Sequence, residues 1–208
     1  IYDHRALRQT IQKHLAGRPF RVPLHVGRVS LVSGAYESVR SEQSTETEVL
    51  DAIFHSATMP VVWEAVGPHA WADGGLRNMT PLGDALDFNP TELIVLSCSP
   101  DQPEIVPRPA DILAAARRSL ADITINEIMV DDVREFIRIN KLVDQAKRQG
   151  VTLVNDVGEP YVHCDIDVLE PRAPLGDSLD FSPETIAERI ERGKQVARDY
   201  LAGARGPA

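Results

Sequence analysis

Four consecutive apolar residues at positions 93–96, Leu-Ile-Val-Leu, constrain the fold of this chain more than any other feature. A short apolar run of this kind is typical of a strand buried on both faces, as in a parallel sheet covered by helices. Helical patterns follow over residues 109–130 and 131–149, and a second strand pattern follows over 161–169. Strands that alternate with helices indicate an α/β fold. The length of 208 residues fits one domain, or most of one.

Local start and stop signals predict the remaining elements. Ser33-Gly34 marks the turn of a hairpin, and Thr45 with Glu48 has the spacing of a capping box. Ser182-Pro183 opens a helix with a capping residue and a proline in the first turn. The predicted elements are a helix over 4–16, strands over 24–32 and 35–39, helices over 45–59 and 82–86, a short strand over 151–153 and a helix over 183–201.

The composition excludes some classes of function. The chain has 31 acidic and 22 basic residues and a net charge of −9, without the basic cluster of a nucleic-acid-binding protein. No apolar run approaches the roughly 18–20 residues that span a bilayer. We therefore expect no nucleic-acid partner and no transmembrane segment. Cys98 and Cys164 lie in apolar strand-like segments, so we expect both to be buried and reduced.

The segment Asp73-Gly74-Gly75 is the strongest candidate for chemistry. Asp73 stands at the end of a strand-like segment, and glycines there allow a sharp turn and a close backbone approach. Loops at strand ends of α/β sheets commonly hold reacting groups. A lone Asp-Gly-Gly is nevertheless most often a simple turn, so the motif needs support from other segments.

That support comes from the surrounding sequence. The combination of Ser-Ala-Thr-Met-Pro at 56–60 with Asp73-Gly74-Gly75, then Asn78 and Pro81, resembles the patatin-like phospholipase family. Asn78 and Pro81 stand one residue further apart than is common in its bacterial members. Segments at 1–8 and 174–182 also resemble parts of that family, so the resemblance covers most of the chain and is most specific around Asp73.

The resemblance implies a patatin-like α/β sheet covered by helices and a lipid acyl hydrolase of the phospholipase or esterase type. In that family a serine in Gly-x-Ser-x-Gly attacks the ester carbonyl, and the aspartate of Asp-Gly-Gly takes or orients its proton. Asp73 is then the catalytic residue, and Gly74, Gly75 and Asn78 shape its loop. The substrate is a lipid or another acyl ester, with no cofactor and no metal, in the cytoplasm or at a membrane surface of a bacterium.

Residues 1–208 contain no Gly-x-Ser-x-Gly and no glycine-rich oxyanion loop. We therefore expect the serine outside this chain, together with the N-terminal strand and the nucleophile helix of the same domain, which would be its partner. The 208 residues alone are then inactive. Two alternatives remain open: a non-catalytic patatin-fold binding or regulatory module, and an unrelated α/β domain in which Asp73 is a turn residue.

Other polar residues have simpler interpretations. His69 lies four residues before Asp73 and could be a general base, but a candidate base needs demonstrated geometry, and we favour a surface position. His163, Asp165 and Asp167 alternate along a predicted strand and could bind a metal. We favour the polar face of a half-buried strand instead.

Overall fold

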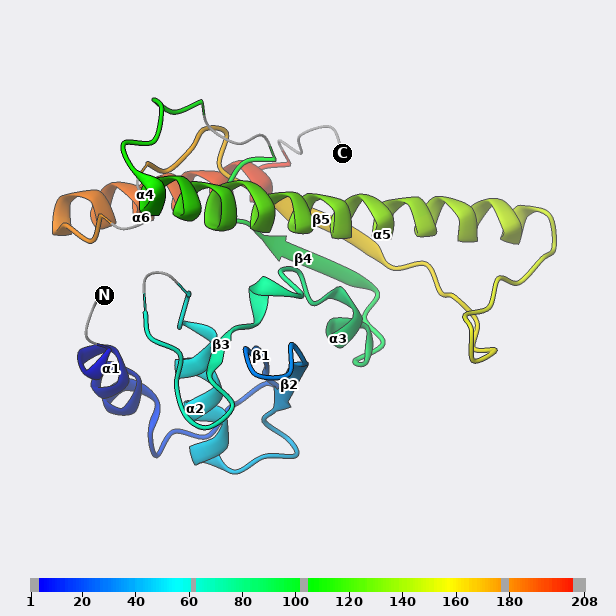
Figure 1. Cartoon of the computed structure of the whole chain (residues 1–208). Coiled ribbons are helices and arrows are strands. Elements are labelled where there is room, and N and C mark those ends of the chain that lie inside the picture. Colours follow the sequence, from blue (N-terminus) through cyan, green and yellow to red (C-terminus); the bar gives the residue numbers. More distant parts are fainter. Residues whose placement is uncertain (1–3, 61–62, 102–104, 177–179, 204–208) are drawn as a thin grey trace. The chain divides into compact units, whose positions relative to one another are not determined.

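The computed structural model describes residues 4–60, 63–101, 105–176 and 180–203 and has a mixed α/β secondary structure (Figure 1). The chain divides into two compact units, Ile1–Asp87 and Phe88–Ala208. The expected mixture of helices and sheets is confirmed. The patatin-like arrangement, and the assignment of residues 1–208 to the C-terminal part of a single domain, stay predictions.

The first unit contains a three-stranded antiparallel sheet in the order β2-β1-β3. Its strands are β1 (His25–Ser30), β2 (Tyr36–Arg40) and β3 (Trp71–Asp73). The hairpin β1–β2 confirms the predicted turn, in which Gly34 has a φ of 72° that favours glycine. Val26 pairs with Val39 across the hairpin, so two buried side chains face the same core.

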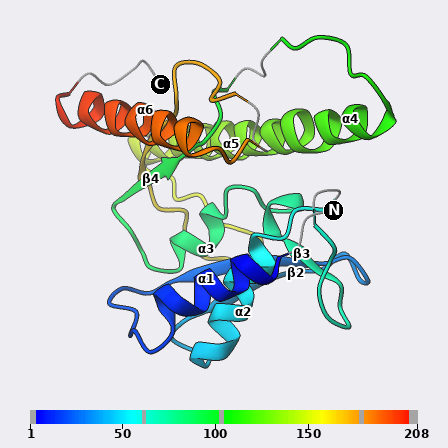
Figure 2. The same cartoon turned by 90° about the vertical axis from the view of Figure 1, so that its left-hand side faces the viewer.

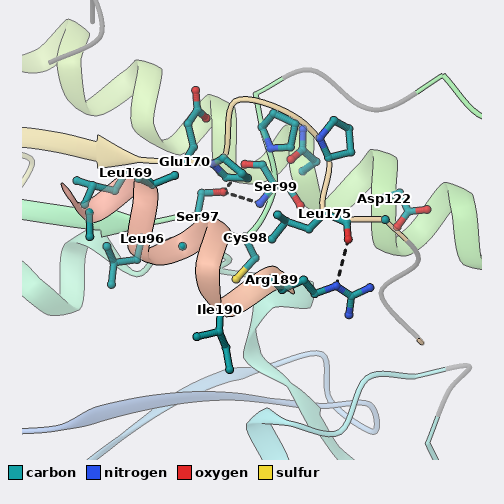
Figure 3. Close-up of a pocket in the computed structure, with 18 of the residues that line it drawn as sticks. Leu96, Ser97, Cys98, Ser99, Asp122, Leu169, Glu170, Leu175, Arg189 and Ile190 are labelled. Carbon is teal, nitrogen blue, oxygen red and sulfur yellow. Dashed lines mark hydrogen bonds between the residues drawn. The ribbon is translucent and has the colours of Figure 1, made fainter. Parts of the chain in front are cut away.

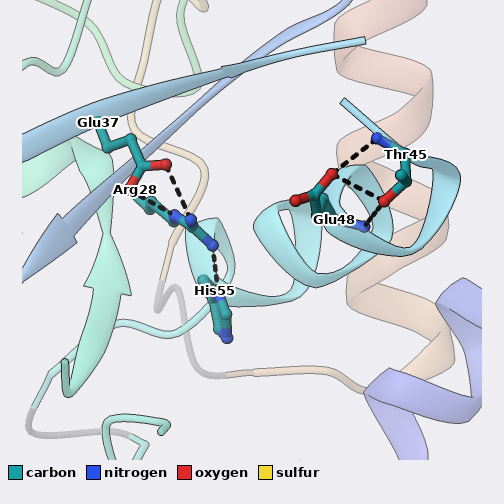
Figure 4. Close-up of polar contacts among 5 residues, drawn as sticks. All are labelled: Arg28, Glu37, Thr45, Glu48 and His55. Atoms are coloured by element: carbon teal, nitrogen blue, oxygen red, sulfur yellow. Dashed lines mark hydrogen bonds and ion pairs between the residues drawn. The ribbon is translucent and has the colours of Figure 1, made fainter. Parts of the chain in front are cut away.

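Helix α2 (Glu46–Ser56) packs on this sheet. The unit also contains the helices α1 (Arg5–Leu15) and α3 (Leu82–Leu86) and the 3-10 turn η1 (Gly74–Leu76). The capping box of Thr45 and Glu48 begins α2, as predicted (Figure 4). The helix predicted over 82–86 is also confirmed. Its N-cap residue is Pro81, and no side chain makes a capping hydrogen bond. Helix α1 packs on α2 (Figure 2). The buried core comprises Val26, Val39, Val49 and Ala52, with Phe20, Leu24 and Ile53 packed against it.

The second unit contains two parallel strands, β4 (Glu92–Leu96) and β5 (Asp165–Leu169), paired from Glu92 with Asp165 to Leu96 with Leu169. Its helical elements are α4 (Ile112–Arg117), the π-helical segment η2 (Arg118–Thr124), α5 (Ile125–Arg148) and α6 (Pro183–Leu201). The parallel pairing confirms the class of sheet expected from the apolar run. The Ser182 side chain accepts a hydrogen bond from the Thr185 backbone N–H and caps α6, as predicted.

Several sequence expectations for this unit were wrong. The run at 93–96 is not buried on both faces, because Ile94 and Leu96 are 53% and 75% exposed. The helices predicted over 109–130 and 131–149 form one helical stretch from Ile112 to Arg148, since no glycine, proline or cap interrupts the chain at 130–131. Residues 151–153 are not a strand, and β5 begins only at Asp165 because the preceding segment forms a loop closed by the bridge between Val154 and Pro160.

Within the described ranges, no helix has the length and apolar character needed to cross a membrane.

Candidate active site

Asp73 ends strand β3 and caps the turn η1. Its Oδ1 accepts a hydrogen bond of 2.8 Å from the backbone N–H of Gly75. Its own backbone N–H donates to the carbonyl of Thr58 at 3.0 Å. Thr58 is 1% exposed, and its hydroxyl donates to the carbonyl of Phe54 at the end of α2. The structure therefore joins the two segments that carried the sequence motif, residues 56–60 and the Asp-Gly-Gly turn.

The two glycines after Asp73 meet different surroundings. A Cβ on Gly74 would lie 2.5 Å from the carbonyl carbon of Gly27 and 2.6 Å from its oxygen, so only glycine lets η1 approach β1 this closely. A Cβ on Gly75 would meet the sulfur of Met79 at 2.7 Å, the far end of a flexible side chain. Of these two positions, therefore, only position 74 strictly requires glycine.

Asn78 closes the loop through its backbone. The N–H groups of Arg77 and Asn78 both donate to the carbonyl of Gly74 at 3.0 Å. The half-buried side chain of Asn78 is close enough to Tyr36 to lower its pKa slightly, and the Tyr36 hydroxyl donates to Asp84 at 2.8 Å. Burial, followed by the contact with Asp84, raises the pKa of Tyr36 above its ordinary range. The predicted loop residues Gly74, Gly75 and Asn78 are thus brought together with Asp73.

Burial is the main electrostatic influence on Asp73. It raises the pKa of the carboxyl above its usual value, and the hydrogen bond from Gly75 lowers that pKa by a smaller amount. Among the residues that the structure describes, no basic side chain forms an ion pair with Asp73. A partly buried carboxylate without a counter-charge is a better proton acceptor than an exposed one.

Arg28 explains this absence of a counter-charge. It pairs with Asp73 across β1 and β3, yet its guanidinium donates to Glu37 at 2.9 Å and to Nδ1 of His55 at 3.2 Å (Figure 4). The guanidinium carbon also lies 4.1 Å from the centre of the Trp71 ring. Because arginine can only donate, Nδ1 of His55 accepts, and the proton of the neutral ring is on Nε2.

His55 is a buried histidine that the sequence analysis did not single out. Burial, and next the charge of Arg28, lowers its pKa from 6.5 to about 4. The group formed by Arg28, Glu37, His55 and Trp71 comes from four elements, β1, β2, α2 and β3. No spacing within the sequence connects these residues, so only tertiary structure reveals them.

The histidine considered as a base has a packing role. The ring of His69 lies 5.1 Å from that of Trp71, and its carbonyl accepts a hydrogen bond from the Ser30 hydroxyl at 3.0 Å. His69 is exposed, as favoured from the sequence. None of the polar contacts found for the described residues joins it to Asp73.

The polar residues near β5 are engaged with one another. Nδ1 of His163 lies 3.0 Å from Asp144, and Nε2 lies 3.1 Å from Asp165. Asp167 accepts a hydrogen bond from the Tyr200 hydroxyl at 2.7 Å. In the part of the chain that the structure describes, no three such side chains are placed to hold a metal ion.

The prediction for the cysteines was half wrong. Both are free, and Cys164 is buried, but Cys98 is exposed because it lies in the loop after β4 and not within the strand.

No protein-family model matches the chain, and no curated protein matches its sequence.

Proposed function

We propose that this chain supplies the catalytic aspartate of a patatin-like lipid acyl hydrolase, whose Ser–Asp dyad takes its serine from outside residues 1–208. Asp73 is the base or orienting partner, and Gly74, Gly75 and Asn78 shape its loop. One observation carries the proposal. The hydrogen bond from the N–H of Asp73 to the carbonyl of Thr58 joins the two segments that the sequence motif had selected, residues 56–60 and the Asp-Gly-Gly turn.

The geometry of Asp73 suits proton transfer. Gly75 holds Oδ1, and Oδ2 makes no hydrogen bond within the described structure. A serine hydroxyl is a weak nucleophile until a positioned base takes its proton. As the serine oxygen bonds to the ester carbonyl carbon, its proton moves to Oδ2 of Asp73. The alcohol leaves with that proton, and water then cleaves the acyl–serine ester.

The raised pKa of Asp73 supports this role. An acid or base works best when its pKa lies close to the working pH, because it must both accept and return a proton. Burial moves the pKa of Asp73 upward, toward that range. The substrate class, an acyl ester of a lipid or lysolipid, comes from the resemblance.

The test is ester hydrolysis by the full-length protein against its Asp73→Asn variant, with short- and long-chain p-nitrophenyl esters. Asparagine keeps an oxygen for the Gly75 N–H and removes the base. The rate should fall about 10³-fold or more, as when one member of a catalytic unit is lost. The matched control is Asp87→Asn, which neutralises a carboxylate paired with Arg40 in the same unit and should keep full activity.

Equal rates for Asp73→Asn and the unchanged protein would reject the dyad. A folded full-length protein without activity toward any ester would instead favour the non-catalytic binding module.

A further inference from the structure

Three charged side chains form one row across the sheet of the first unit. Arg28 in the central strand β1 pairs in register with Glu37 of β2 on one side and with Asp73 of β3 on the other. Directly opposite residues of antiparallel strands project their side chains from the same face, with Cβ atoms about 4.5–5.5 Å apart. One arginine therefore lies between two carboxylates at equivalent positions, and either could be its partner.

Arg28 pairs with only one of these two carboxylates (Figure 4). Its Nη2 and Nε donate to Glu37 at 2.9 and 3.4 Å, and its Nη1 lies 3.2 Å from Nδ1 of His55. The guanidinium also lies over the ring of Trp71, which precedes Asp73 by two residues and shares its face of β3. Among the described residues, Asp73 forms no ion pair with Arg28. The guanidinium thus lies on the face of Asp73 without pairing with its carboxylate.

Glu37 provides the only counter-charge among the contacts of Arg28 in the described structure. The ring of His55 is neutral near pH 7 because burial, and next the charge of Arg28, lowers its pKa to about 4. The side chain of Arg28 is only 16% exposed, and a largely buried guanidinium needs a charged partner. Glu37 therefore decides where this guanidinium lies.

The other charged groups that α1 and α2 bring near Arg28 have partners of their own. Asp51 on α2 forms an ion pair with Arg8 on α1, and Glu48 on α2 is held in the capping box. Oδ2 of Asp73, in contrast, makes no hydrogen bond within the described structure. A guanidinium released from its present partner would therefore pair with Asp73.

The position of Arg28 depends on side chains alone, since its described contacts are one carboxylate and two rings. Arg189, beside the cavity of the second unit, has main-chain partners instead. It donates to the carbonyls of Leu175 and Asp180 at 3.1 and 2.9 Å (Figure 3). Substitution removes a side-chain partner and leaves a main-chain partner in place, so a single mutation can move Arg28.

We propose that Glu37 is a positioning residue, which holds the guanidinium of Arg28 off the Asp73 carboxylate and so leaves Asp73 without a counter-charge. For catalysis this role rests on the proposed function, because a carboxylate paired with arginine is a weaker base. The arrangement itself does not depend on that function, since the protonation of Asp73 can be measured without a substrate.

The experiment follows the carboxyl carbon of Asp73 by ¹³C NMR through a pH titration of the full chain. Glu37→Gln keeps the size of the side chain and removes its charge. Arg28 should then turn to Asp73 and lower its pKa by about 1 or more, as an arginine does beside an aspartate. The carboxyl group then binds its proton about tenfold more weakly. Glu37→Leu, which removes the acceptor oxygens as well, should lower the pKa at least as far.

Three further variants separate this effect from a general loss of charge. Glu37→Asp keeps a carboxylate and should leave the pKa of Asp73 close to its starting value. Arg28→Gln in the Glu37→Gln background should restore that value, because no guanidinium remains. Asp87→Asn removes a carboxylate from Arg40 in the same unit. It is the matched control for the loss of one negative charge and should leave the pKa of Asp73 unchanged.

Either of two results would overturn the proposal. In the first, the pKa of Asp73 stays the same in both Glu37→Gln and Glu37→Leu. In the second, the pKa falls but does not recover when Arg28 is also removed.

Ester hydrolysis adds a readout that a merely structural role would not move. In the full-length protein, Glu37→Gln should move the acid limb of the kcat/KM pH profile to lower pH by as much as the pKa of Asp73 falls, because that limb reports the base of the free enzyme. Full activity of Asp73→Asn, or an acid limb that does not follow the NMR titration, would count against the Ser–Asp dyad alone. The titration would still decide the role of Glu37.

Discussion

The backbone N–H of Asp73 donates to the carbonyl of Thr58 across 3.0 Å. Thr58 lies two residues beyond the end of α2, and Asp73 ends β3. This main-chain hydrogen bond fixes the backbone of Asp73, and the hydrogen bond from the Gly75 N–H to Oδ1 then holds the carboxylate.

Alanine substitutions at the two glycines after Asp73 should differ in their effect on the free energy of unfolding. Gly74→Ala forces a methyl group against the backbone of Gly27 and should lower the free energy of unfolding by about 1–3 kcal/mol, as overpacking does. Gly75→Ala should cost less, because Met79 can move. Urea unfolding measures both, with Gly83→Ala in the open helix α3 as a neutral or stabilising control. Equal losses at 74 and 75 would contradict the close approach.

Arg28→Lys should destabilise the first unit although the charge is kept. Lysine cannot make the two-nitrogen contact with Glu37 or lie flat on Trp71. We expect a loss of about 1–2 kcal/mol in the free energy of unfolding. Arg40→Lys keeps the charge of a single, largely solvent-accessible ion pair with Asp87 and should change little. An unchanged free energy of unfolding in Arg28→Lys would show that the contacts of Arg28 with Glu37 and Trp71 contribute only packing.

His55 should make the first unit sensitive to acid. Its pKa falls from 6.5 to about 4 on folding, so between these values the unfolded chain binds a proton that the folded chain excludes. Stability from this residue is complete above the unfolded pKa, decreases as the pH falls toward the folded value, and changes no further below it. His55→Gln should flatten this part of the stability curve. If the stability of both proteins depended on pH in the same way, the lowered pKa of His55 would be contradicted.

Asn140 should be the most sensitive polar residue of α5. Its Nδ2 donates to the carbonyl of Cys164 at 2.6 Å, and its Oδ1 accepts from the N–H of Cys164 at 3.3 Å. Asn140→Leu leaves two buried backbone groups unpaired and should cost about 2–4 kcal/mol in unfolding free energy. Gln145→Leu, on an exposed position of the same helix, is the control. If Asn140→Leu lowers the free energy of unfolding no more than the control does, water molecules must pair with the two backbone groups of Cys164.

The two cysteines should differ in reactivity. N-ethylmaleimide should modify the exposed Cys98 within minutes, whereas the buried Cys164 should react only after unfolding. Burial also raises the pKa of Cys164, which lowers its thiolate fraction. Mass spectrometry of the native chain should find one label, and denaturant should allow the second. Two labels on the native chain would contradict the burial of Cys164.

Elements with local signals could be predicted from the sequence. The capping box of Thr45 and Glu48 and the Ser182-Pro183 start both lie where the structure begins a helix. These signals work because a capping side chain bonds to a backbone N–H only three residues away. The Asp73 turn also followed from its glycines, which adjoin it in the sequence.

Features that depend on distant residues could not be predicted. The π-helical segment η2 and the exposed outer face of β4 have no local signature, since burial depends on which elements pack nearby. The same holds for the contact of Arg28 with Trp71 and for its register with Glu37 and Asp73. In each case a residue acquires its role from partners supplied by other elements.

The parallel ladder of β4 and β5 also has a consequence for the order of folding. Its register pairs Glu92 with Asp165, so closing it requires a long intervening chain to lose entropy before any ladder bond forms. The β1–β2 hairpin closes across a short turn, and α5 needs only neighbouring residues. We expect the hairpin and α5 to form early and the ladder late. The parallel sheet of the second unit is then one of the last features to appear in a refolding chain.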